Sequence, residues 1–187
     1  MGAEILEQAN ASTEKILANV SADQLTLASP CASWAVRDVV NHLVGNNFWF
    51  EAIARDGVAP ERPNNAAPDE TGGDYVGRFR EGSSRAVSAF ASAMDKTLDL
   101  GFAQMPGSVF ILMASADQFV HGWDIAKATG QETALDSDLA AGFLAFYRQA
   151  IADAFRGPDA AAPFGPAVTT DRTDPVSELI AFSGRNP

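Results

Sequence analysis

The chain has 187 residues and a formal net charge of −11, from 13 Lys and Arg against 24 Asp and Glu. That charge repels phosphate backbones and anionic lipids on average, and no basic cluster offers a local exception, so we predict no nucleic-acid partner and no membrane partner. The length suits a single domain over residues 1–187. The one cysteine, Cys31, excludes an internal disulfide. With no secretory signal and no apolar run approaching the roughly 20 residues that span a bilayer, we predict a cytoplasmic protein.

Helical spacing of apolar residues predicts a first helix over residues 3–20. A connection follows over 21–33, and Ser33 at its end is a candidate cap for the next helix. We expect that second helix over 35–55, ended by Gly57. The stretch 58–73 is rich in Pro, Asn and Gly, which is typical of a long surface loop.

The second half of the chain continues in the same way. We expect helices over 74–94, from Pro106 to 129, over 137–155 and, in a shorter form, over 174–182. Pro106 suits a helix start and Gly130 a helix end. Strand-like alternation is nearly absent, and long helices in this number predict an all-α helical bundle.

The helix expected over 106–129 carries acidic residues and a histidine on an apolar face. At 100° per residue, Asp117, His121 and Asp124 share one side of this helix with Phe110 and Ala114. The other sides are also largely apolar, so the helix is expected to be buried. Because buried carboxylates are costly unless they are paired or bind a metal, a compensating group is required.

Asp117 and His121 are four residues apart, so both side chains can reach one point. Carboxylate and imidazole at this spacing are two ligands of a divalent metal site. His42, the only other histidine, is the candidate third ligand from a facing helix. Three protein ligands leave coordination positions open, which is the pattern of a catalytic site.

A second interpretation stands beside this one. An Asp–His pair at this spacing is also found as a hydrogen-bonded buried pair without any metal, and His42 lies on the flank of its helix's apolar stripe. Spacing alone does not decide between the two interpretations. The HExxH motif of metalloproteases is missing, which excludes that class.

Two segments resemble a known family. Ser29–Phe50 (SPCASWAVRDVVNHLVGNNFWF) and Ala116–Gln131 (ADQFVHGWDIAKATGQ) are similar to the mycothiol-dependent maleylpyruvate isomerase-like proteins of the DinB-like superfamily. The ending Asp174–Pro187 resembles the short, single-domain branch of that family. The resemblance implies a four-helix bundle in up-down-down-up order with additional C-terminal helices. It also implies a metal held by His42, Asp117 and His121.

The resemblance further implies a function. We expect a metal-dependent thiol S-transferase or isomerase of the mycothiol type, acting on a small electrophile. Zn²⁺ is the expected metal, with Ni²⁺, Mn²⁺ or Fe²⁺ as alternatives, and a small thiol is the expected cosubstrate. A non-catalytic bundle that binds a metal or a small molecule is the alternative function. The oligomeric state stays open, with a homodimer as one candidate. No residue is assigned a catalytic or cofactor-binding role.

Several other residues are candidates for roles near this site. Asp124, one turn beyond His121, is either an outer partner that orients an imidazole or a structural ion-pair residue. Cys31 is expected to be a small buried core residue rather than a reactive thiol. Trp34, Trp49 and Trp123 are expected in the core, with Trp49 and Phe48 as candidates to line an entrance near His42.

Overall fold

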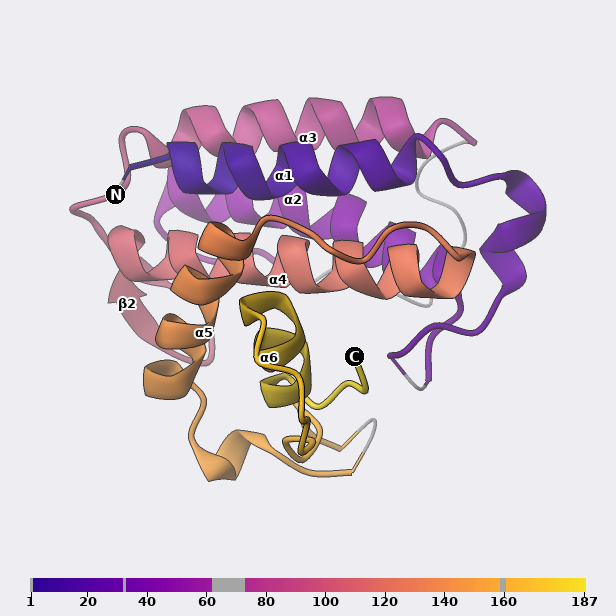
Figure 1. Cartoon of the computed structure of the whole chain (residues 1–187). Coiled ribbons are helices and arrows are strands. Elements are labelled where there is room, and N and C mark those ends of the chain that lie inside the picture. Colours follow the sequence, from indigo (N-terminus) through magenta and orange to yellow (C-terminus); the bar gives the residue numbers. More distant parts are fainter. Residues whose placement is uncertain (1, 32, 62–72, 159–160) are drawn as a thin grey trace.

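The computed structural model describes residues 2–31, 33–61, 73–158 and 161–187 (Figure 1). Six α-helices dominate this part of the chain: α1 Glu4–Leu17, α2 Val36–Asp56, α3 Tyr75–Phe90, α4 Gly107–Thr129, α5 Ser137–Ala150 and α6 Pro175–Phe182. Two short 3-10 helices, η1 Ala22–Thr26 and η2 Asp153–Phe155, and two three-residue strands, β1 Thr97–Asp99 and β2 Gln104–Pro106, complete the described elements. The predicted all-α class is confirmed.

Helices α1 to α4 form a bundle with roughly parallel axes. In Figure 1, α1 and α4 run in one direction, and α2 and α3 run in the opposite direction. This is the expected up-down-down-up order. In this arrangement α1 packs on α4 and α2 packs on α3. Helices α5 and α6 pack on each other and lie beside the bundle on the side of α4 (Figure 1).

The ends of α2 and α4 follow the local sequence. Gly57 and Gly130, just past these two helices, have φ angles of 80° and 71°, in the left-handed region that glycine enters without steric cost. Pro106 precedes α4 in extended conformation. The first N–H groups of a helix have no intrahelical partner, so the missing N–H of proline costs nothing at this position. The predicted start and ends are confirmed here, so both helices that carry the candidate site have well-defined limits.

The core runs through the bundle as two clusters of buried side chains. The larger one contains Phe90, Phe110, Phe119 and Phe143, which are all fully buried. Six aromatic rings from α2, α3, α4 and α5 make contacts there, with centroids 5.4–6.0 Å apart. The rings of Trp49, Phe50 and Phe90 contact Phe110, and that of Phe143 contacts Phe119. Helix α4 is buried on most of its surface, as its apolar sequence predicts.

Several boundary predictions were wrong. Ser33 does not cap α2: Ala35 is the cap residue, and the Asp38 carboxylate accepts a hydrogen bond from its N–H at 2.8 Å. Helices α3 and α5 end at Phe90 and Ala150, before the predicted 94 and 155. The hairpin of β1 and β2 was not predicted, because strands of three residues are too short to show alternation.

Most of the loop predicted over 58–73 lies outside the described residues. Of its ends, Val58 forms a bridge with Asp99, and Trp49 donates a hydrogen bond from its indole to the carbonyl of Pro60 at 3.2 Å. Within the described ranges, no helix is both long and apolar enough to cross a membrane.

Two glycines make a matched pair for testing the packing of α4. A Cβ at Gly107 would overlap the backbone carbonyl of Ala93, whereas a Cβ at Gly142, exposed within α5, would meet nothing within 4 Å. We expect Gly107→Ala to destabilise the protein by about 1–3 kcal/mol, as overpacking does. Gly142→Ala should stabilise it by about 0.5–1 kcal/mol, because alanine loses less backbone entropy in a helix.

Urea unfolding of both variants, followed by circular dichroism, checks this prediction. Equal midpoints for the two variants would show that the junction between α3 and α4 yields easily, contrary to the close contact of Gly107 with Ala93.

Candidate metal centre

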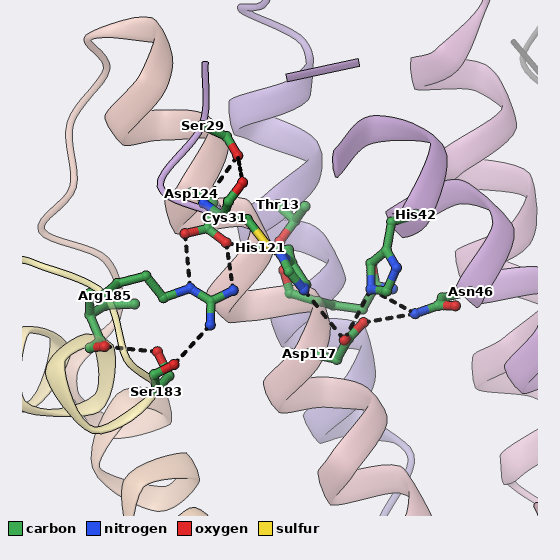
Figure 2. Close-up of polar contacts among 12 residues, drawn as sticks. Thr13, Ser29, Cys31, His42, Asn46, Asp117, His121, Asp124, Ser183 and Arg185 are labelled. Atoms are coloured by element: carbon green, nitrogen blue, oxygen red, sulfur yellow. Dashed lines mark hydrogen bonds and ion pairs between the residues drawn. The ribbon is translucent and has the colours of Figure 1, made fainter. Parts of the chain in front are cut away.

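The predicted ligands meet where α2 faces α4. His42 comes from α2, and Asp117 and His121 lie one turn apart on α4. One ligand atom from each residue can be chosen so that all three lie within 4.8 Å of one another. A single oxygen, Oδ1 of Asp117, lies 3.1 Å from Nε2 of His42 and 3.7 Å from Nε2 of His121 (Figure 2). The structure therefore brings all three predicted residues to one point.

Asn46, one turn after His42 on α2, joins this cluster. Its side-chain nitrogen lies 2.9 Å from His42 Nε2 and donates a hydrogen bond to Oδ2 of Asp117 at 3.1 Å. The side chain is buried. Sequence reasoning missed Asn46, although its spacing of four residues from His42 is the same signal that selected Asp117 and His121.

The contacts of Asn46 determine which atoms carry protons. Its amide NH₂ group only donates, so both of its partners, His42 Nε2 and Asp117 Oδ2, must accept. With the amide reversed, its oxygen would face a carboxylate oxygen, which is unfavourable. In the tautomer with its proton on Nδ1, Nε2 of His42 therefore presents a lone pair 3.1 Å from an oxygen of Asp117.

The imidazole of His121 is oriented by a contact of its Nδ1 nitrogen with Asp124. Nδ1 of His121 lies 2.9 Å from Oδ2 of Asp124, which is fully buried. A proton on Nδ1 donates to this carboxylate, so Nε2 of His121 also presents a lone pair toward Asp117. Asp124 is thus the outer partner of a histidine, in the arrangement usual around metal-bound imidazoles.

Arg185, from the segment after α6, holds Asp124 in turn. Its Nε and Nη2 donate to the two oxygens of Asp124 at 3.2 and 2.9 Å, a bidentate pair (Figure 2). Sequence reasoning missed Arg185. The only signal was that a carboxylate at position 124 on a buried face requires a positive partner.

The charges of the cluster follow from these contacts. Burial opposes ionisation of Asp117, but the positive charge that His42 and His121 carry when protonated, together with the hydrogen bond from Asn46, outweighs it and holds the pKa of this carboxyl below its usual range. Burial likewise opposes ionisation of Asp124, and Arg185 and His121 outweigh it, so the pKa of Asp124 is also lowered. Burial lowers the pKa of His121 despite its hydrogen bond to Asp124, which favours the neutral imidazole.

Trp34 covers the two imidazoles. Its ring centroid lies 4.8 Å from that of His42 and 5.5 Å from that of His121, on which it stacks at 25°. Trp34 is half-buried and packs against the smaller core cluster as well as on the two imidazoles, so it belongs both to the edge of the core and to the site. Trp49 is in the core as predicted, and Phe48 lies under Arg78.

Access and neighbouring groups complete the site. His42 is only 5% exposed, whereas the side chain of Asp117 keeps 24% of its surface accessible, so solvent reaches the cluster from the Asp117 side. Nδ1 of His42 is buried without a hydrogen-bond partner among the described residues. Cys31, half-buried rather than in the core as predicted, is close enough to Arg185 to interact with it electrostatically.

Three acceptor atoms with one formal negative charge therefore converge at one point: two imidazole lone pairs and one carboxylate oxygen. This donor set fits a divalent metal ion such as Zn²⁺, which binds neutral imidazole nitrogen and carboxylate oxygen. The fold and this cluster together define an all-α bundle protein with a candidate metal centre between its second and fourth helices.

Comparison with known proteins places the chain in a family. The sequence model of the mycothiol maleylpyruvate isomerase N-terminal domain matches residues 6–126, and the chain belongs to this family. It is also similar to the uncharacterized proteins MT0763 and Rv0738 of Mycobacterium tuberculosis, from strains CDC 1551 / Oshkosh and ATCC 25618 / H37Rv. Each is 38% identical over 173 residues, which cover 91% of this chain and 90% of the relative. No solved structure is a significant match to the chain.

Proposed function

We propose that this protein binds one divalent metal ion, Zn²⁺ first among the candidates, through His42 Nε2, Asp117 and His121 Nε2. The observation that carries the proposal is the convergence of two imidazole lone pairs on one oxygen of Asp117, at 3.1 and 3.7 Å. Acceptors facing one another at these distances repel unless a proton or a metal ion lies between them. A metal ion would satisfy all three ligand atoms at once, whereas a proton between Asp117 and His42 satisfies only those two.

We further propose that the bound metal serves a thiol-dependent transfer or isomerisation of a small electrophile. The family description, which names a mycothiol maleylpyruvate isomerase, supports the thiol. A bound divalent metal would lower the pKa of a coordinated thiol or water and so supply a nucleophile near neutral pH. The protein's own residues would hold the ion through one carboxylate and two imidazole nitrogens. The accessible side of Asp117 would admit the small molecule.

We also propose that residues 1–187 act as one metal-binding domain. Side chains of α2 and α4 and the segment after α6 meet at the same cluster, so the C-terminal part of the chain belongs to the site.

Metal content is the first test of this function. We expect untagged protein, purified without chelators, to contain close to one equivalent of a divalent metal by plasma mass spectrometry. Chelator treatment should remove the metal, and added Zn²⁺ should raise the unfolding temperature again. Protein that neither contains metal nor gains stability with Zn²⁺, Ni²⁺, Mn²⁺ or Fe²⁺ would leave a purely structural bundle.

The thiol is tested separately on the cobalt-substituted protein. We expect mycothiol to produce an absorption band of thiolate-to-Co²⁺ charge transfer that saturates with thiol concentration, with glutathione as the comparison thiol. A protein that holds Co²⁺ but shows no such band with either thiol would favour the alternative function, a metal-binding bundle without thiol chemistry.

A further inference from the structure

The end of the chain is built to place one arginine against the candidate metal centre. Helix α6 closes with Ser183, and Gly184 follows with a φ of 91°. The N–H of Arg185 donates to the carbonyl of Ile180 and that of Gly184 to the carbonyl of Ala181, both at 3.0 Å. These two bonds form a Schellman motif, which fixes the direction of the backbone at Arg185.

The segment is also anchored by its side chains. Leu179 and Ile180 of α6 are fully buried in the core. The hydroxyl of Ser183 donates to the carbonyl of Ile180 at 2.8 Å, and Nη1 of Arg185 donates to the carbonyl of Ser183 at 3.0 Å. Nη1 of the guanidinium is thus bound to the backbone of its own segment, while Nε and Nη2 face Asp124. The fold therefore fixes the position and orientation of the guanidinium.

Arg185 and Asp124 form a nearly buried ion pair, with side chains 10% and 0% exposed. A buried ion pair offers little net stability, because desolvation offsets most of the attraction, so stability alone does not account for it. This pair has a second contact: Asp124 Oδ2 accepts from Nδ1 of His121 and from Nη2 of Arg185, each at 2.9 Å (Figure 2).

We propose that Arg185 is a positioning residue which acts through Asp124 to hold His121 in its Nδ1–H tautomer, with Nε2 turned toward Asp117. The proposal rests on the proposed metal site and adds to it that the segment after α6 completes that site. The family match ends at residue 126, so Arg185 lies outside the part of the chain that it covers. A bundle cut after α5 would keep all three ligands but lose the group that orients one of them.

The physical reason is the placement of Asp124. Without Arg185 this buried carboxylate would lose the two donors that hold both of its oxygens, and it would turn away from its site. That change weakens the acceptor that keeps the proton of His121 on Nδ1. Asp117 Oδ1, 3.7 Å from Nε2, is then the remaining acceptor, and a proton on Nε2 would block that nitrogen as a ligand.

The experiment uses the full chain and two readouts. Zn²⁺ affinity is measured by competition with a chromophoric chelator. In the metal-free protein, long-range ¹H–¹⁵N correlation spectra report which nitrogen of His121 carries the proton. We expect Arg185→Gln to lower the Zn²⁺ affinity about 10–100-fold, as loss of an outer partner does. We also expect it to convert His121 from the Nδ1–H tautomer to a mixture with the Nε2–H tautomer.

Two further variants keep the test decisive. Arg185→Gln leaves the buried Asp124 without its cationic partner, which puts folding at risk. The double variant Asp124→Asn/Arg185→Gln removes the buried charge as well and should show the same two effects. The matched control is Arg148→Gln, which removes an exposed arginine that pairs with Glu178 of α6 at 3.1 Å. It should change neither readout.

Wild-type tautomer and affinity in the folded variants would overturn the proposal, as would a change in only one of the two readouts. If the wild type itself binds no Zn²⁺, the proposed function fails, and the tautomer spectra of the metal-free proteins alone decide whether Arg185 holds the ring of His121.

Discussion

Replacing His121 by alanine is expected to lower the affinity for Zn²⁺ by at least about 100-fold, beyond the range typical of outer partners. The variant loses one of three protein ligands, and two remaining ligands from different helices do not make a stable Zn²⁺ site. Competition with a chromophoric chelator measures the loss. Since Asp124 also loses its hydrogen-bonded imidazole, the stability of the metal-free variant must be measured separately.

Thermal unfolding gives an independent measure of the same effect. At a free Zn²⁺ concentration of 100 times the Kd, wild type should gain about 2.7 kcal/mol, which corresponds to roughly 5–10 °C for a chain of this size. His121→Ala should gain little at that concentration. An equal temperature shift in both proteins would place the bound Zn²⁺ somewhere other than the His42–Asp117–His121 cluster.

Asp117→Asn refines this test, because it keeps the size of the side chain and removes its charge. It should also weaken Zn²⁺ binding strongly, since the carboxylate supplies the only formal negative charge among the three ligands. The matched control is Asp56→Asn, which removes the same charge from an exposed carboxylate paired with Arg55 at the end of α2. This control should bind Zn²⁺ like wild type.

The sequence predicts the bundle and the pair Asp117 and His121 because both depend on helical periodicity, whereas His42 was predicted as the only other histidine and from the family resemblance. Asp117 and His121 meet at four-residue spacing on a helix whose burial is evident from its composition. The ends at Gly57 and Gly130 follow from the conformational freedom of glycine. Such signals are local, so they can be detected without knowledge of the tertiary structure.

The residues that surround the ligands are harder to predict, because their positions depend on chain segments that meet only in the folded state. Arg185 is 61 positions from Asp124, and nothing local distinguishes it from the other arginines. Trp34 lies in the connection before α2, and its stacking on His121 depends on how that connection folds back onto α4. The predicted cap at Ser33 was wrong for a related reason: Asp38 binds the N–H of Ala35 from inside the helix.

The core at the other end of α4 should matter more for stability than for metal binding. Phe110 is fully buried and packs against the rings of Trp49, Phe50 and Phe90, with centroids 5.5–6.0 Å away. It precedes Asp117 by seven residues, which is about 10 Å along a helix. Phe110→Ala is expected to lower the free energy of unfolding by about 3–5 kcal/mol, from lost burial and the cavity that remains.

Phe102→Ala is the matched control, because it deletes the same ring from the turn between β1 and β2, where the side chain is 64% exposed. We expect it to change stability by no more than about 0.5 kcal/mol. Urea unfolding compares the two, and Zn²⁺ affinity should stay near the wild-type value in both folded variants. A cost below about 1 kcal/mol for Phe110→Ala would mean that the aromatic cluster repacks around the gap. A loss of Zn²⁺ affinity in that folded variant would instead show that the core sets the spacing of α2 and α4 at the metal centre.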